Sequence, residues 1–354
     1  MHHMPPSPGV NTNPTNLSNH EDKVTYRAGG IDMDFNRPKR IVLQVVCVCG
    51  MQEIRCLERE REALLQFKSA IVDYGGMLSS WTTAADCCHW EGIRCSNLTG
   101  HVLMLHLHGE AANIDYDFYD DSYDDSVDGF LDSPSARYIS GEIHESLMEL
   151  HQLKHLNLSQ NYFQDSHIPH FFGSFTNLIS LDLSYSGFRG KIPCQIGSLS
   201  HLKYLNLAGN FLEGSIPYQL GKLFKLQHLD LSNNNLEGNI PSELGKLSKL
   251  QKLFLGGFEY DGTLKIDVGN HHGGQWLSNL SSLTYLYLHS ISNLESSHHW
   301  LRMIGKLPNL KELALIGCNL SDHFILSMGP SKFNFSTSLS AFDLSDLTTA
   351  SPHP

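Results

Sequence analysis

Residues 202–241 read LKYLNLAGNFLEGSIPYQLGKLFKLQHLDLSNNNLEGNIP, and this stretch holds two copies of one pattern. Each copy opens with Leu-x-x-Leu-x-Leu, first at Leu202 and again 24 residues later at Leu226. An asparagine follows eight residues after each of these leucines, at Asn210 and Asn234, and each copy ends in Gly-x-Ile-Pro. A fixed period in the twenties predicts a repeat protein whose coils stack on one another.

The same frame continues in both directions from this stretch. Further copies begin at Leu153, Leu178, Leu250, Leu283, Leu310 and Leu339, and a partial copy begins at Val102. The leucines of such a strand point into the coil, and the residues between them point outward. One coil cannot bury its own apolar face, so stacked coils share a core. We therefore predict an α/β fold, a right-handed leucine-rich-repeat solenoid with a parallel concave sheet of about nine strands.

The asparagine of the repeat has its own predicted role. A buried amide at this place can satisfy backbone groups of the turning loop that would otherwise remain unpaired. Asn161, Asn210 and Asn234 are therefore expected to be buried. Cys318 occupies the same place in a later copy, so we expect a core cysteine there rather than a reactive thiol.

Charge is concentrated in one segment of the 354-residue chain. The net charge is -12, and residues 110–132 supply -9 of it through one Glu and eight Asp with no Lys or Arg. This balance argues against a general nucleic-acid binder, which needs a basic surface. The first two copies are 51 residues apart, so residues 110–138 are expected to leave the coil as a solvated loop. Calcium binding and docking of a partner are the alternatives, although the Gly and terminal Glu of a calcium loop are missing.

The N-terminal region has the pattern of a secreted protein. Residues 1–36 are polar and are expected to be disordered. Arg37, Lys39 and Arg40 then precede the short apolar run 41–49, which is typical of a signal peptide. The alternative is a buried strand beside a disordered tail. The predicted organisation is a disordered extension plus signal peptide at 1–50, a cap at 51–99 and repeats at 100–354, and no apolar run in the chain is long enough to span a membrane.

Four cysteines cluster between the signal and the repeats, near Trp81 and Trp90. They are Cys56, Cys87, Cys88 and Cys95. Zinc is the competing interpretation, but adjacent cysteines ligate one tetrahedral ion poorly and no Cys-x-x-Cys is present. An oxidised module in a secreted chain is favoured, with three pairings open. Just beyond Cys56, the 3–4 spacing of Leu64, Phe67 and Ile71 predicts a helix over 58–72, ended by Gly75-Gly76.

The combination of motifs resembles one family. The Gly-x-Ile-Pro at residues 190–193, 214–217 and 238–241, followed by x-x-Ile/Leu-Gly-x-Leu, resembles the plant-specific leucine-rich repeat. Residues 56–68 and the later Cys-Cys-x-Trp-x-Gly-x-x-Cys resemble the cap of plant leucine-rich-repeat receptor-like proteins of the disease-resistance, elicitor-receptor type. The resemblance covers roughly 56–347, the N-terminal part of such an ectodomain. It implies a horseshoe with an extra strand at Gly-x-Ile-Pro, and disulfides Cys56–Cys87 and Cys88–Cys95.

The resemblance also implies a function. Such receptors lie outside the plant cell, bind peptide, protein or glycan elicitors, and signal through co-receptor kinases. A secreted inhibitor of a microbial cell-wall-degrading enzyme, similar to the polygalacturonase inhibitors, is the alternative. We expect no catalysis, cofactor or metal, because His144-Glu145 lacks the second histidine of a zinc-protease helix and kinase motifs are absent.

Two sets of surface residues follow from the frame. The outward positions of the concave strands give a predicted ligand-binding set, and the alternative is that its aromatic members pack against the long loops after Leu255 and Leu288. This set is Asp182, Tyr204, Asn206, His228, Asp230, Phe254, Tyr285, Tyr287 and His289. The Asn-x-Ser/Thr motif predicts glycans on some of Asn97, Asn157, Asn279, Asn319 and Asn334.

Overall fold

The computed structural model describes residues 55–110, 136–164, 166–257, 264–266, 275–294, 299–318, 320 and 339–344. The predicted signal peptide and almost all of the acidic insertion lie outside these residues. Within them, no helix has the length and apolar character needed to cross a membrane.

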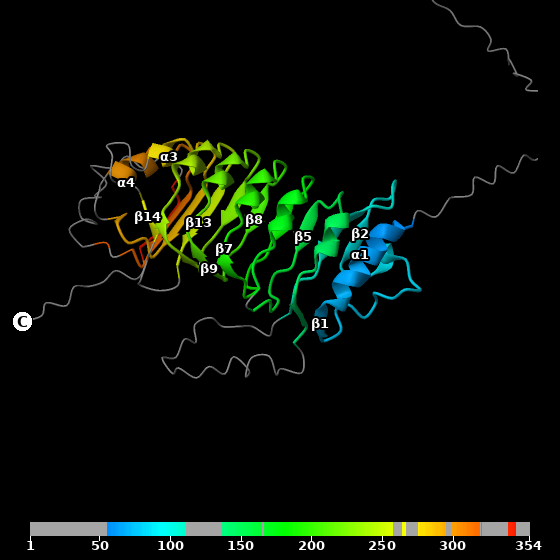
Figure 1. The fold of residues 1–354 in the computed structure, drawn as a ribbon. Helices are drawn as coiled ribbons and strands as arrows, with labels where there is room; N and C mark the ends of the chain where they lie inside the picture. The colour runs from blue at the N-terminus through cyan, green and yellow to red at the C-terminus, as the bar shows by residue number, and fades with distance from the viewer. Residues whose placement is uncertain are drawn as a thin grey trace, which may run out of the picture. The chain divides into compact units, whose positions relative to one another are not determined.

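A ten-stranded sheet dominates the described structure (Figure 1). Nine of its strands are parallel, as the leucine frame predicts, and the tenth, β2 (Ile93–Cys95), comes from the cap and runs antiparallel to β3. The parallel strands are β3 (Val102–His106), β5 (His155–Asn157), β6 (Ser180–Asp182), β8 (Tyr204–Asn206), β10 (His228–Asp230), β13 (Lys252–Gly256), β15 (Tyr285–His289), β16 (Glu312–Ile316) and β17 (Ala341–Asp343).

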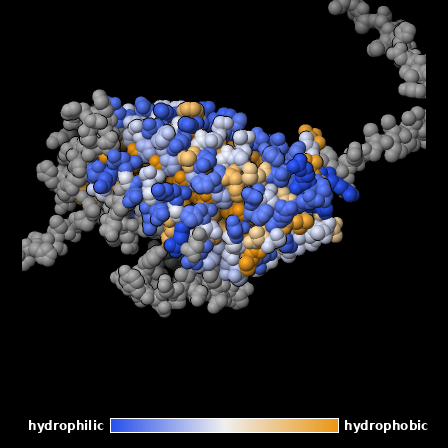
Figure 2. All heavy atoms as spheres, in the orientation of Figure 1, coloured by the Kyte–Doolittle hydropathy of each residue, from blue (hydrophilic) through white to orange (hydrophobic). Residues whose placement is uncertain are grey.

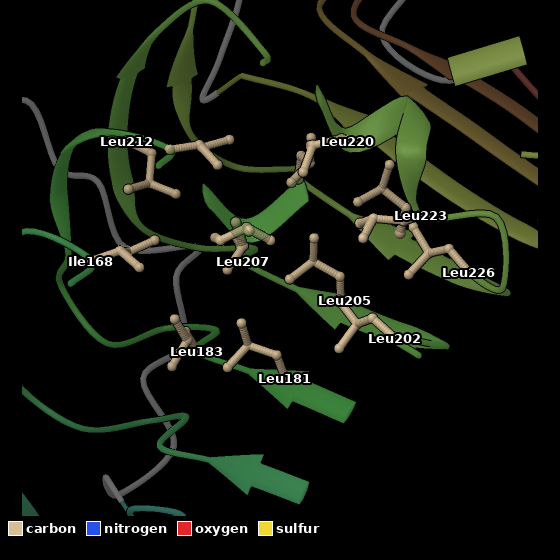
Figure 3. Close-up of a cluster of buried hydrophobic side chains, with 14 of the residues drawn as sticks. Ile168, Leu181, Leu183, Leu202, Leu205, Leu207, Leu212, Leu220, Leu223 and Leu226 are labelled. Carbon is tan, nitrogen blue, oxygen red and sulfur yellow. The ribbon is translucent and has the colours of Figure 1, made fainter. Parts of the chain in front are cut away.

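The repeat leucines form one continuous core. All three leucines of every copy from Leu153 to Leu315 are buried, with at most 2% of each side chain exposed. Figure 3 shows Leu202, Leu205 and Leu207 pointing into the space enclosed by their coil. Each fully buried leucine contributes about 2 kcal/mol of hydrophobic stabilisation, shared across neighbouring coils.

The asparagines are buried where the sequence predicts, and they bond the backbone of two coils. The Nδ2 of Asn210 donates to the carbonyl oxygens of Leu183 (2.9 Å), Leu207 (3.0 Å) and Ala208 (3.2 Å). Its Oδ1 accepts from the backbone N–H of Ser186 (3.2 Å) and of Phe188 (3.0 Å). Asn161 and Asn234 repeat this pattern. The expectation for the repeat asparagine is therefore confirmed.

Short helices and a second sheet close each coil. The 3-10 helices are η2 (Glu145–Glu149), η3 (His170–Ser174), η4 (Cys194–Ser198), η5 (Tyr218–Lys222) and η6 (Ser242–Lys246), followed by α3 (Gln275–Ser278) and α4 (His299–Ile304). At or near Gly-x-Ile-Pro, the strands β7 (Arg189–Lys191), β9 (Phe211–Gly214) and β11 (Asn235–Leu236) form a parallel sheet, and β12 (Gly238–Asn239) pairs with β14 (Leu264–Lys265). These are the extra strands that the resemblance implies.

The cap differs from the prediction in one element. Helix α1 (Glu58–Ser69) ends three residues before the predicted end, and β1 (Ile71–Tyr74) follows it. β1 pairs antiparallel with β4 (Tyr138–Gly141), and Gly75-Gly76 ends this strand rather than the helix. The helix prediction over 58–72 was wrong at its end because the β-branched Ile71 and Val72 find a partner strand more than 60 residues away.

The cap is bonded covalently and electrostatically. Cys56 is joined to Cys87, in η1 (Cys87–His89), and Cys88 is joined to Cys95, which is the pairing that the resemblance implies. The buried carboxylate of Glu60 accepts from the backbone N–H of Val102 (2.7 Å) and lies 2.8 Å from Nδ1 of His101. This carboxylate ties α1 to the first concave strand, a contact that sequence reasoning did not find.

Candidate ligand-binding face

The strand register places the predicted outward residues in two columns on the concave sheet. In one column, the partners on β6, β8, β10, β13 and β15 are Asp182, Asn206, Asp230, Phe254 and Tyr287. In the neighbouring column they are Ser180, Tyr204, His228, Lys252 and Tyr285. The predicted register is therefore confirmed, whereas the binding role of these residues stays a prediction.

Five rings on this face form a continuous chain, which we call the ring row: Tyr204, His228, Phe254, Tyr287 and His289. Its neighbouring ring centroids lie 4.5, 5.5, 5.8 and 6.3 Å apart in that order. The first pair is stacked, with 14° between the planes. Beside the row, the Lys252 ammonium lies 4.7 Å from the Tyr285 ring centroid, within cation–π range. The rings come from four strands that are consecutive in the sheet, so no single segment creates this surface.

The side chains of the ring row are half-buried, and burial changes the pKa of three of them. Burial, aided by the charge of Lys252, lowers the pKa of His228 from 6.5 to about 4, so its imidazole is neutral near pH 7. Burial also raises the pKa of Tyr204 and of Tyr287 above 10.0, so both phenols keep their protons. At these three residues the row therefore offers ring faces and neutral polar edges, which suits binding hot spots.

The acidic and amide members of the predicted set have a structural task. The Asp182 Oδ1 accepts from the backbone N–H (3.1 Å) and the hydroxyl (2.7 Å) of Ser184. Asp230 bonds Ser232 in the same way, and Asn206 accepts from the backbone N–H of Ala208 at 3.0 Å. Burial is the main cause that raises the pKa of Asp230. These side chains cap the turn after each strand, a role that sequence reasoning missed although the repeated Asp/Asn-Leu-Ser pattern signals it.

The other predicted sites divide between described and undescribed residues. Asn97 and Asn279 are exposed, while Asn157 is half-buried and its Oδ1 accepts from the N–H (2.9 Å) and hydroxyl (2.6 Å) of Ser159. Asn319 and Asn334 lie outside the described residues. Glycosylation of all five stays a prediction.

The four cap cysteines are the one group in the described ranges whose potential ligand atoms for a metal lie together, within 4.8 Å of one another. Because they form two disulfides, they offer no thiolates to zinc.

Sequence-family models match most of the described chain. A model described as a leucine rich repeat N-terminal domain matches residues 57–96, and one described as a leucine-rich repeat region matches residues 172–327. Receptor-like protein EIX1 of Solanum lycopersicum is 34% identical over 279 residues, which is 77% of this chain and 20% of that protein. The chain belongs to the plant leucine-rich-repeat receptor-like proteins.

Other similar proteins agree with this family. Receptor-like protein EIX2 of Solanum lycopersicum is 40% identical over 140 residues, or 40% of this chain and 12% of its own length. This receptor-like chain therefore spans about an eighth to a fifth of the length of these two relatives. Among solved structures, the Arabidopsis receptor kinase HAESA, in complex with the peptide hormone IDA and the co-receptor SERK1, has a TM-score of 0.56 and 26% identity. That match covers 73% of this chain and 38% of the matched chain in that structure.

Proposed function

We propose that this receptor-like chain is an extracellular recognition module that binds peptide, protein or glycan elicitors on its concave face, at the ring row. In this proposal it has no catalysis of its own and acts with a partner kinase as part of a cell-surface immune receptor. The ring row carries the proposal, because it places five contiguous rings on a face whose other half holds small polar groups. HAESA, whose structure contains a peptide hormone and a co-receptor, supports the choice of a receptor.

Location outside the cell is supported by the cap. Two disulfides fix the segment that precedes the first repeat, and disulfides persist in oxidising compartments. The ring row also constrains the ligand. Half-buried neutral rings favour a ligand segment with apolar or ring-shaped groups, because these groups lose little hydration when they are covered.

The test pairs a variant that removes Tyr287 of the ring row and Tyr285 beside it with a matched control on the same sheet. Peptides are selected from a phage-displayed random library on the secreted wild-type chain, and their affinity is then measured by calorimetry. Tyr285→Ala combined with Tyr287→Ala should weaken selected peptides roughly 30-fold or more, since hot-spot truncation costs about 2 kcal/mol or more. His155→Ala with Ser180→Ala, in the polar half of the face, should change the affinity less than threefold (about 0.6 kcal/mol).

Two results would contradict the proposal. Unchanged affinity in the tyrosine variant, with its circular dichroism spectrum intact, would remove the ring row from the site. Inhibition of a secreted polygalacturonase by the isolated wild-type chain would favour the inhibitor function over the receptor.

A further inference from the structure

Along one edge of the described solenoid, the connections between the short helices and the concave strands carry lysines and no Asp or Glu. This edge consists of the connections in which each short helix leads into the next concave strand, at residues 150–154, 175–179, 199–203, 223–227, 247–251, 279–284 and 305–311. We add to it Lys222 and Lys246, the last residues of η5 and η6; the equivalent last residue of η2 is Glu149. Every charged residue in these connections is a lysine, although Asp and Glu outnumber Lys and Arg in the whole chain by 37 to 25. The lysine edge comprises Lys154, Lys203, Lys222, Lys225, Lys246, Lys249, Lys306 and Lys311.

Backbone hydrogen bonds join these connections, coil by coil, into one row. The N–H of Ile179 donates to the Lys154 carbonyl at 2.7 Å, and the N–H of Lys203 donates to the Ile179 carbonyl at 2.8 Å. The same link repeats coil by coil until the N–H of Lys311 donates to the Thr284 carbonyl at 2.8 Å. Because parallel strands are spaced about 4.8 Å apart, the six steps place the lysines along roughly 29 Å of the solenoid. The centre is densest, since three consecutive coils contribute five of the eight.

The ammonium groups of the lysine edge are not neutralised by the rest of the described structure. All eight side chains are exposed, and none makes an ion pair or a side-chain hydrogen bond with another described residue. Glu149, which ends η2 beside the first connection, bonds Arg59 of the cap at 3.1 Å instead. Lysines on adjacent coils repel one another, so a row that mixed lysines with acidic residues would make the folded chain more stable. In the view of Figure 2, the rim formed by the short helices is mostly hydrophilic.

An exposed aromatic ring lies within the same edge. Phe224 is 58% exposed and stands between Lys222 and Lys225 in the turn after η5. A ring face flanked by ammonium groups can stack on the C–H face of a sugar while the ammonium groups bond its carboxylates. We propose that the lysine edge binds a linear acidic polysaccharide, a polyuronide with one carboxylate on each sugar, laid along the solenoid axis and across Phe224.

The shape and the charge of the edge favour this partner. A linear polymer can follow a narrow row over several coils and meet ammonium groups on five of the seven coils of this edge. Lysine is a point charge on a flexible stem, which tolerates variation in the spacing of the carboxylates. None of the eight lysines belongs to the ring row, although Lys203 directly precedes Tyr204 in the chain.

The test uses polygalacturonate as the probe and the secreted chain as the protein. Binding is measured by calorimetry at 50 and 200 mM NaCl, with neutral dextran as the uncharged comparison. The double variant Lys225→Gln with Lys249→Gln should weaken polygalacturonate binding by tenfold or more. Each lysine at an anionic surface raises the affinity on the order of fivefold. The same two positions changed to Arg should keep the affinity, and Phe224→Ala should weaken binding without changing its salt dependence.

A matched control distinguishes the effect of the lysine edge from the effect of the chain's net charge. Lys191→Gln with Lys265→Gln removes the same charge from exposed residues of β7 and β14, and should leave the affinity within twofold. Equal weakening by both double variants would overturn the proposal, as would equal binding of dextran. Binding to vesicles containing phosphatidylserine but not to polygalacturonate would assign the edge to a membrane surface instead. The absence of any salt-sensitive binding would also refute it.

Discussion

Replacement of Asn210 by alanine should unfold the solenoid at a markedly lower temperature. The side chain is fully buried and makes five hydrogen bonds, three to carbonyl oxygens and two from backbone N–H groups. A net hydrogen bond contributes about 1 kcal/mol, and a buried group left unpaired costs 1–3 kcal/mol. The Asn210→Ala variant should therefore lose about 3–5 kcal/mol.

The loss can be read from thermal unfolding followed by circular dichroism. For a domain of this size, each kcal/mol lowers Tm by about 2–4 °C, so a fall of roughly 10 °C is expected. Asn239→Ala is the matched control, because Asn239 is an exposed asparagine of the following coil. Exposed substitutions of this kind change stability by less than about 0.5 kcal/mol. If the two variants melted within 2 °C of each other, water or a shifted backbone would satisfy the backbone groups that Asn210 bonds in the wild type. The stabilising role assigned to the buried asparagine would then be refuted.

Two further predictions concern titratable side chains. Because burial lowers the pKa of His228 from 6.5 to about 4, the unfolded chain binds more protons than the folded one between these values, so the stability due to this group falls as pH drops through this window. Wild-type chain should therefore lose more of its Tm between pH 7 and pH 4.5 than His228→Phe does, and parallel curves would contradict this assignment. Burial also raises the pKa of Cys318 to about 11, whereas Cys194 is exposed. Iodoacetamide at pH 8 should label Cys194 and spare Cys318 until denaturant is added, as peptide mass spectrometry would show; rapid native labelling of Cys318 would refute its burial.

The fold could be predicted from the sequence because the leucine pattern is local and recurs in every coil. Each leucine of the frame faces the same environment in every coil, so spacing alone predicts the strands, their parallel order and the columns of Asp182 and Tyr204. The burial of Asn161, Asn210 and Asn234 follows in the same way. The cap departs from this rule, because the conformation of Ile71 depends on pairing with β4, which begins at Tyr138, the last residue of the predicted acidic insertion.

The sequence by itself determined the solenoid, its register and the residues that face outward, since stacking of identical coils leaves one solution for a 24-residue period. Only the tertiary structure decided which of these outward residues contact one another and how far each is buried. Stacking of Tyr204 on His228 removes water from the imidazole and lowers its pKa, which no spacing in the chain encodes. Likewise, the lysines become one edge only when successive coils are hydrogen-bonded side by side. Charge and burial depend on distances across coils, and folding sets these distances.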